Sequence, residues 1–227
     1  MMIDLHTHSI FSDGELIPSE LVRRAITHGY SAIAITDHVD FTNIEFVMDA
    51  LKKISSVENE WDEFGIEVLA GVELTHVPPA KIGKLADKAR SLGAEIIVVH
   101  GETIVEPVAP GTNAAALSAD IDILAHPGLI TNDEAECARE NGIFLEITAR
   151  AGHNRANGHV ARVATDVGCD LVVNTDTHAP GDLITDEMAM KVAMGAGLTE
   201  RDATFAVSTN PLRLVGLALD RRTADQS

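Results

Sequence analysis

The chain has 227 residues, enough for one large hydrophobic core, and its apolar content of 45% is ordinary for a globular protein. Its formal net charge of −18 argues against a general nucleic-acid binder, because binding to a phosphate backbone needs many Lys and Arg side chains. It has no apolar run of membrane-helix length and no secretion signal, so we expect one cytoplasmic domain, residues 1–227, without a membrane partner. The two cysteines, Cys137 and Cys169, fit no metal or redox spacing.

Short stretches rich in Ile, Val and Leu alternate along the chain with longer segments of helical periodicity. The expected strands cover residues 3–5, 32–36, 66–72, 95–99, 121–125, 143–147 and 171–174. The expected helices cover residues 19–28, 45–62, 81–92, 133–141, 158–167 and 186–196, then a late helix capped by Thr199 and a short C-terminal helix from Asn210. Seven strand-then-helix units predict a parallel sheet. A single-domain (β/α)7 barrel is the simplest architecture, and an open doubly wound sheet is the alternative.

Six of the seven expected strands end in His, Asp or Glu. These residues are His6, His8 and Asp13 after the first strand, Asp37 and His38 after the second, then Glu73, His100 and His126, and finally Asp176 and His178 after the last. The carboxyl ends of all strands in a parallel barrel open onto one face, where active sites lie. Convergence of these groups at that face favours the barrel over the open sheet.

The types of these side chains indicate metal binding. His6 and His8 are two residues apart, as are Asp176 and His178, so each pair points to one side of an extended strand. Imidazole mixed with carboxylate is typical of zinc, manganese or iron sites. Nine candidate ligands exceed the needs of one tetrahedral ion, so we expect two or three divalent ions with a bridging carboxylate. The nine are His6, His8, Asp13, His38, Glu73, His100, His126, Asp176 and His178.

The same residues lie in recognisable motifs. The run Asp4-Leu5-His6-Thr7-His8-Ser9, with Ser12-Asp13-Gly14, resembles the opening motif of the PHP family (polymerase and histidinol phosphatase). Its later motifs resemble, in order, Thr36-Asp37-His38, Gly71-Val72-Glu73, His100, Ala125-His126-Pro127 and Asn174-Thr175-Asp176-Thr177-His178. The resemblance extends over nearly the whole chain and implies a distorted (β/α)7 barrel with a trinuclear site.

Carried over residue by residue, the resemblance divides the ligands among three ions. It implies a first ion on His6, His8, Glu73 and Asp176, a second on Glu73, His100 and His126, and a third on Asp13, His38 and His178. Asp13 departs from the histidinol phosphatases, which often carry His there. Asp37 is expected to orient a ligating histidine, because such histidines usually need an acceptor for their second nitrogen.

Clustered divalent ions predict hydrolysis of a phosphate ester by metal-activated hydroxide, without a nucleophilic Ser or Cys. The resemblance implies a small phosphomonoester as substrate, with histidinol phosphate as one candidate. We expect Glu73, Asp176, Asp37 and Arg150 to be catalytic, and Arg150, His153 and Arg155, in the loop after the sixth strand, to bind the substrate. Residues 102–112 are expected to form a flap over the site.

Other functions stay open at this point. One is a phosphodiesterase or 3′–5′ exonuclease acting on nucleotides or short oligonucleotides. A second is an RNA-binding scaffold like the ribonuclease P protein subunit of similar fold. A third is an amidohydrolase, although Glu73 stands where that class would usually carry a metal-bridging lysine. His28 is expected to cap a helix and His159 to start one at the surface, whereas His76 and His153 could be structural or functional.

Overall fold

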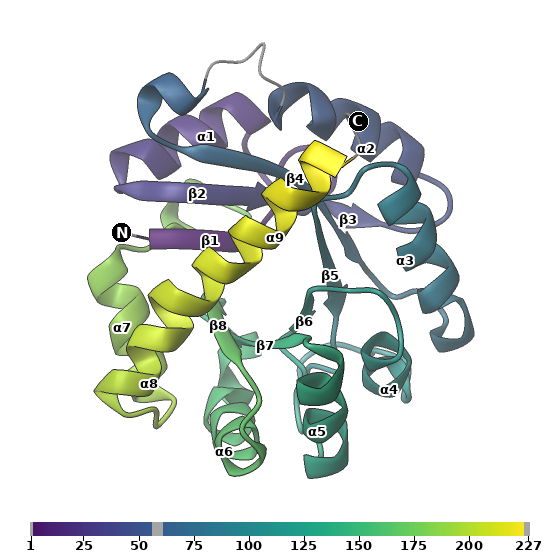
Figure 1. Ribbon diagram of the computed structural model, residues 1–227, viewed down its shortest axis with the longest axis vertical. Coiled ribbons are helices and arrows are strands. Elements are labelled where there is room, and N and C mark those ends of the chain that lie inside the picture. Colours follow the sequence, from purple (N-terminus) through teal and green to yellow (C-terminus); the bar gives the residue numbers. More distant parts are fainter. Residues whose placement is uncertain (1, 56–60, 225–227) are drawn as a thin grey trace.

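In the computed structural model, which describes residues 2–55 and 61–224, parallel strands form a nearly closed barrel surrounded by helices (Figure 1). In the order in which they pair, the strands are β1 Met2–Thr7, β2 Tyr30–Ile35, β4 Glu67–Leu74, β5 Ile96–His100, β6 Ile123–Ala125, β7 Phe144–Thr148 and β8 Leu171–Asn174. A two-residue strand, β3 His38–Val39, continues the line of β2 beside β4. All seven expected strands are present, to within two residues at each end.

The barrel closes between β1 and β8. Thr7 and Thr177 form an isolated parallel bridge, the His8 N–H donates to the Thr177 carbonyl at 2.8 Å, and the Asp176 N–H donates to the His6 carbonyl at 3.0 Å. This closure joins the carboxyl end of β1 to the residues that directly follow β8. The prediction of a barrel is therefore confirmed, and the open sheet is wrong.

The described helices are α1 Pro18–Thr27, α2 Ile44–Ser55, α3 Ile82–Ser91, α4 Thr112–Leu117, α5 Asn132–Asn141, α6 Asn157–Val167, α7 Asp186–Gly195, α8 Glu200–Thr204 and α9 Asn210–Ala224. The expected helices are found, and α4 was not predicted. The expected end of the 45–62 helix falls partly on residues outside the described part, and Trp61–Phe64 forms a 3₁₀ turn. The C-terminal helix is longer than predicted, and a π-helical turn, Phe205–Thr209, joins it to α8.

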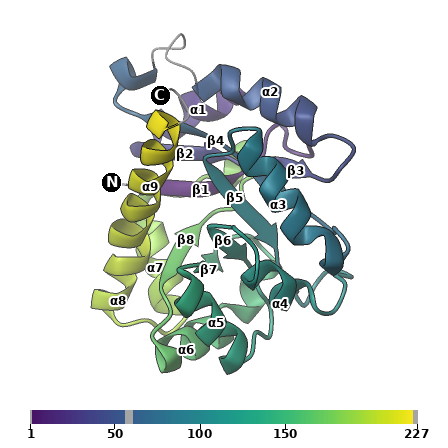
Figure 2. The same ribbon diagram turned by 45° about the vertical axis from the view of Figure 1, so that its right-hand side comes forward.

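Helix α9 covers one end of the barrel (Figures 1 and 2). Leu214, Val215 and Ala218 are buried against residues that point into the barrel, such as Leu5 and Leu69. Burying a Leu or Val side chain contributes about 1.5–3 kcal/mol to the free energy of unfolding, so these contacts stabilise the position of α9.

Polar contacts attach α9 to the amino ends of the strands. The Asn210 side chain donates to the Leu171 carbonyl at 2.8 Å, and Arg222 donates to the Val68 carbonyl at 3.0 Å and pairs with Glu95. The carboxyl ends, where the predicted ligands lie, are therefore the open end of the barrel. None of the described helices is long and apolar enough to cross a membrane.

Candidate metal centre

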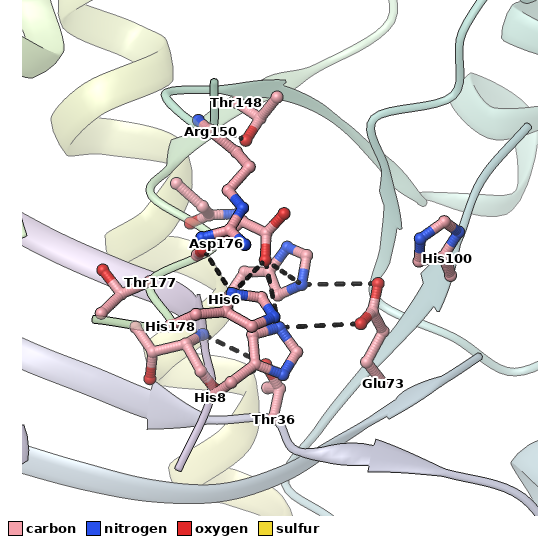
Figure 3. Close-up of polar contacts among 12 residues, drawn as sticks. His6, His8, Thr36, Glu73, His100, Thr148, Arg150, Asp176, Thr177 and His178 are labelled. Carbon is pink, nitrogen blue, oxygen red and sulfur yellow. Dashed lines mark hydrogen bonds and ion pairs between the residues drawn. The ribbon is translucent and has the colours of Figure 1, made fainter. Parts of the chain in front are cut away.

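Side chains from distant parts of the chain meet at the open end of the barrel (Figure 3). His6 and His8 extend from the end of β1, Glu73 from β4, and Asp176 and His178 from the turn after β8. The His6 Nε2 atom lies 3.4 Å from Glu73 Oε1, and the His8 Nε2 atom lies 3.2 Å from Asp176 Oδ1. Barrel closure between β1 and β8 places Asp176 and His178 beside residues more than 160 positions earlier.

The nine predicted ligands form overlapping groups whose ligand atoms lie within 4.8 Å of one another. These groups are His6, His8 and Glu73; His6, His126 and Asp176; Glu73, His100 and His126; and His8, Asp13, His38 and His178. The third matches the set implied for the second ion, and the fourth contains the set implied for the third ion. The four residues implied for the first ion are divided between the first two groups. The structure therefore brings together all nine side chains.

Several of these atoms are buried without a hydrogen-bond partner. His6 and Glu73 are fully buried, and His8 is nearly so. Within the described residues, His6 Nε2, His8 Nε2 and Glu73 Oε1 make no hydrogen bond. Leaving such an atom unpaired costs about 1–3 kcal/mol. Divalent cations among these atoms would satisfy imidazole and carboxylate lone pairs together, so the residues fit a metal centre.

The carboxylates strongly perturb the histidines of the metal-free protein. Burial alone lowers the pKa of His6, but the carboxylates of Glu146, Glu73 and Asp176 raise it well above its ordinary value. Burial also opposes protonation of His38, yet Glu73, 2.8 Å away, raises the pKa of His38 to about 9. These histidines carry protons that a metal ion would have to displace.

Backbone strain is concentrated at the same place. Among the described residues, the non-glycine residues with positive φ are His76 (53°), His126 (28°) and Asp176 (53°). A non-glycine residue in this region costs about 1–3 kcal/mol, although Asp and His tolerate it better than most. All three lie just after strands at the open end, and such strain is typical of functional sites.

Glu146, which sequence analysis did not identify, is the buried partner of His6. Its Oε2 atom lies 2.7 Å from His6 Nδ1, and both residues are fully buried. A metal-ligating histidine usually donates its second ring N–H to a carboxylate in this way. The available signal was a glutamate between two apolar residues, Leu145 and Ile147, inside strand β7.

Asp37 has a different role from the one predicted. It is fully buried and accepts hydrogen bonds from the Ser9 N–H (2.8 Å), the Ser9 hydroxyl (2.6 Å) and the Ser12 hydroxyl (2.6 Å). Within the described residues its side chain bonds no histidine, so the prediction that Asp37 orients a ligating histidine is wrong. Asp37 instead holds the loop that carries Asp13.

The three substrate-binding candidates occupy different positions. The Arg150 Nη1 atom lies 3.0 Å from Asp182 Oδ2, which also accepts the backbone N–H of His178, so Arg150 is at the edge of the cluster. The Arg155 side chain is exposed and makes no hydrogen bond or ion pair with the described residues. His153 is buried beside His126, with ring centroids 4.3 Å apart.

Residues 102–112, expected as a flap, contribute a carboxylate that the sequence did not single out. The Glu106 side chain lies 3.4 Å from His76 Nε2, 3.2 Å from His100 Nε2 and 3.2 Å from His153 Nε2. Its hydrogen bond with His100 lowers the pKa of Glu106 to about 2. His76 and His153 therefore belong to the surroundings of the cluster.

The two remaining histidines bond backbone carbonyls. The His28 ring contacts the Arg24 carbonyl at 3.0 Å at the end of α1, in agreement with the expected cap. The His159 ring contacts the Ile130 carbonyl at 2.7 Å and is half-buried.

Fold and site together define a parallel (β/α) barrel with a His- and carboxylate-rich candidate metal centre at the carboxyl ends of its strands. Residues 4–104 match the model of the PHP domain. The chain is 56% identical over 220 residues to an uncharacterized protein of Methanocaldococcus jannaschii, covering 95% of this chain and 99% of that protein. The chain belongs to the PHP domain family.

Two further similarities have different implications. The chain is 29% identical over 230 residues to ribonuclease P protein component 3 of Methanosarcina mazei, covering 93% of this chain and 87% of that protein. The crystal structure of histidinol phosphate phosphatase from Lactococcus lactis, complexed with zinc, L-histidinol and phosphate, superposes with a TM-score of 0.61. That comparison covers 87% of this chain and 94% of the phosphatase at 18% identity, so it supports the fold alone.

Proposed function

We propose that this protein hydrolyses a phosphate ester, using two or three zinc, manganese or iron ions held by the nine clustered side chains. The main support for the proposal is that those side chains converge at the open end of the barrel, where His6 Nε2, His8 Nε2 and Glu73 Oε1 are buried without a hydrogen-bond partner among the described residues. Such ions, when bound, acidify a water to near-neutral pKa and offset the charge of the phosphoryl group.

Two carboxylates connect the ligand groups. Glu73 belongs both to the group of His6 and His8 and to the group of His100 and His126, so it would bridge two ions. Asp176 Oδ1 lies 3.2 Å from His8 Nε2 and 3.3 Å from His178 Nδ1, between the first and third sets. Glu146 orients His6 from behind through its 2.7 Å contact. The His6 ring is thus held in place before an ion arrives.

The substrate we propose is a small phosphomonoester, and histidinol phosphate is one candidate. We propose a monoester because the chain belongs to the PHP family and resembles its histidinol phosphatases. The ratio of 35 acidic to 17 basic residues opposes a long nucleic acid, while cations in the site would make it locally attractive to a phosphoryl dianion. We propose that the guanidinium group of Arg150, just after β7, binds the phosphoryl oxygens of the substrate. These oxygens would compete with Asp182 for the guanidinium group.

The direct test uses metal-stripped protein reloaded separately with zinc, manganese or iron. Hydrolysis of p-nitrophenyl phosphate should depend on the added metal, and the Glu73→Gln variant should fall to background. The matched control is Glu95→Gln, a buried glutamate at the amino end of β5 that should leave activity unchanged. Full activity after exhaustive chelation, or no ester hydrolysed with any metal, would overturn the proposal.

A phosphodiesterase or exonuclease would use the same metal chemistry as a phosphomonoesterase. The choice of substrate distinguishes these activities. Bis-p-nitrophenyl phosphate and short oligonucleotides should be cleaved more slowly than p-nitrophenyl phosphate. A preference for the diester or for oligonucleotides would assign the protein to that alternative.

The similarity to ribonuclease P protein component 3 favours one other candidate function, an RNA-binding scaffold. The acidic composition and the intact ligand set weigh against it. An RNA mobility-shift assay at moderate salt tests it, and tight binding of ribonuclease P RNA without esterase activity would replace our first proposal.

A further inference from the structure

Two histidines and one carboxylate at the open end of the barrel lie outside the nine proposed ligands: His76, His153 and Glu106. We propose that His76 and His153 form an anion subsite for the phosphoryl group of the substrate, and that Glu106 fills this subsite in the free protein. The inference rests on the proposed function, because only a phosphoesterase would bring a phosphoryl group to this place.

The contacts of the Glu106 carboxylate with three histidine rings resemble those of a bound anion. Its Oε1 atom lies 3.2 Å from His153 Nε2, and its Oε2 atom lies 3.4 Å from His76 Nε2 and 3.2 Å from His100 Nε2. A carboxylate presents two oxygens on one carbon, as a phosphoryl group presents oxygens on one phosphorus. Ring N–H groups placed to donate to the first are placed to donate to the second.

The subsite adjoins the candidate ion cluster. The His153 ring lies 4.3 Å from the His126 ring, and the His76 ring lies 5.1 Å from the His100 ring, measured between centroids. His100 and His126 are the histidines of the group that contains Glu73. A phosphoryl group between His76 and His153 would therefore lie next to that group.

One of the two histidines, His153, is held in place more firmly than the carboxylate. His153 is buried, and its Nδ1 atom lies 2.8 Å from Thr103 Oγ1. His76 lies two residues after β4 with a positive φ of 53°, and its side chain is 44% exposed. Glu106 lies on a loop without helix or strand, and its side chain is 38% exposed.

The base of that loop is anchored independently of Glu106. Glu102 Oε1 accepts the Gly111 and Asn113 N–H groups at 2.9 and 3.0 Å, and Asn113 donates to the Pro127 carbonyl at 2.9 Å. A Cβ at Gly128 would collide with the Glu102 carbonyl, so the backbones pack closely there. The Glu106 side chain can therefore leave the histidines without disruption of the loop's base.

A cation bound by His76, His100 and Glu106 is the competing explanation, since their ligand atoms also lie within 4.8 Å of one another. That set leaves out His153, which contacts the same carboxylate at 3.2 Å. The anion subsite accounts for both outer histidines. Counting bound ions separates the two explanations.

The test measures binding of inorganic phosphate to zinc-loaded protein by isothermal titration calorimetry, which requires no turnover. If Glu106 occupies the subsite about 90% of the time, its removal should tighten phosphate binding about tenfold in Glu106→Ala. Zinc content, measured by mass spectrometry, should not change. Glu187→Ala, which removes the same charge from the outer helix α7, should bind phosphate like the wild type.

Tighter phosphate binding in Glu106→Ala could come from the vacated subsite or from the loss of one negative charge near the site. A double variant, Glu106→Ala with His153→Ala, distinguishes these two causes. The gain in phosphate affinity should disappear in the double variant. Unchanged or weaker phosphate binding in Glu106→Ala, a gain that persists without His153, or loss of one zinc ion from Glu106→Ala would each overturn the inference.

Failure of the inference and failure of the proposed function give different results. Ester hydrolysis by the wild type, with no gain of phosphate affinity in Glu106→Ala, overturns the inference alone. A His153-dependent gain in a protein that hydrolyses no ester supports the anion subsite and overturns the proposed function.

Discussion

Substitution of Glu146 by Gln tests whether the His6 ligand depends on a buried carboxylate. Gln has nearly the same shape, so the change removes the charge and leaves the packing of β7. The neutral amide oxygen of Gln is a weaker acceptor than the carboxylate oxygen now 2.7 Å from His6 Nδ1, so it orients the ring less firmly and makes Nε2 a poorer donor to a metal ion. We therefore expect Glu146→Gln to bind zinc or manganese more weakly than the wild type.

The size of the effect follows from the geometry. Substituting such a partner typically costs about 10–100-fold in metal affinity. Both Glu146 and His6 are fully buried and their contact is short, so we expect a loss of metal affinity in the upper half of that range. At about 1.4 kcal/mol per tenfold change, this loss corresponds to about 2–2.7 kcal/mol of binding free energy. Loss of Glu146 also removes a cause of the raised pKa of His6, so weaker proton competition offsets part of the loss near neutral pH.

Competition of metal-stripped protein with a chromophoric chelator measures the metal affinity at pH 7 and pH 9. The loss of metal affinity in Glu146→Gln relative to the wild type should be larger at pH 9. Glu95→Gln is the matched control, because Glu95 is buried at the opposite end of the barrel and pairs with Arg222. Metal affinity of Glu146→Gln within twofold of the wild type, or an equal loss in Glu95→Gln, would refute this reasoning.

Three other predictions concern Asp37, His38 and Cys169. Asp37→Ala removes the acceptor of hydrogen bonds from Ser9 and Ser12, which should cost about 1–3 kcal/mol in the free energy of unfolding measured in urea. It should also reduce the number of bound ions by one, because the loop carries Asp13; an unchanged ion count would contradict this. His38 has a pKa of about 9 in the metal-free protein, so below that pH it carries a proton that an ion must displace. Metal loading at pH 7 should release protons in calorimetry, and affinity should rise from pH 7 to pH 9; a pH-independent affinity would be inconsistent. Burial raises the pKa of Cys169 to about 12, so iodoacetamide at pH 8 should alkylate it only after unfolding, and equal rates in native and unfolded protein would argue otherwise.

The strand positions and the nine clustered side chains could be predicted because both depend on local features. Buried parallel strands are short runs of Ile, Val and Leu, and every such run in this chain except β5 is followed by helical periodicity. Since each strand of the barrel runs in the same direction, the residue after each strand arrives at the same end. His6 and Asp176 could therefore be placed together despite their separation in the chain.

Helices α4 and α9 show where local patterns fail. Helix α4, with the sequence Thr-Asn-Ala-Ala-Ala-Leu, follows a loop rich in Pro and Gly and is too short for a clear period. Helix α9 extends to Ala224 because it packs across the amino ends of the strands, where Leu214 and Arg222 find partners. Tertiary contacts of this kind stabilise a helix beyond its local propensity.

The sequence by itself determined the parallel barrel, its ligand-bearing end and the identity of the nine residues gathered there. Only the tertiary structure decided which carboxylate faces which imidazole: Glu146 behind His6, Asp37 on Ser9 and Ser12, and Glu106 between His76 and His153. The His6 and Glu146 side chains are 140 positions apart. The physical reason is that a hydrogen bond is sensitive to tenths of an ångström, and the distance across the barrel is set by closure of β1 on β8 and by the path of the loops rather than by local sequence.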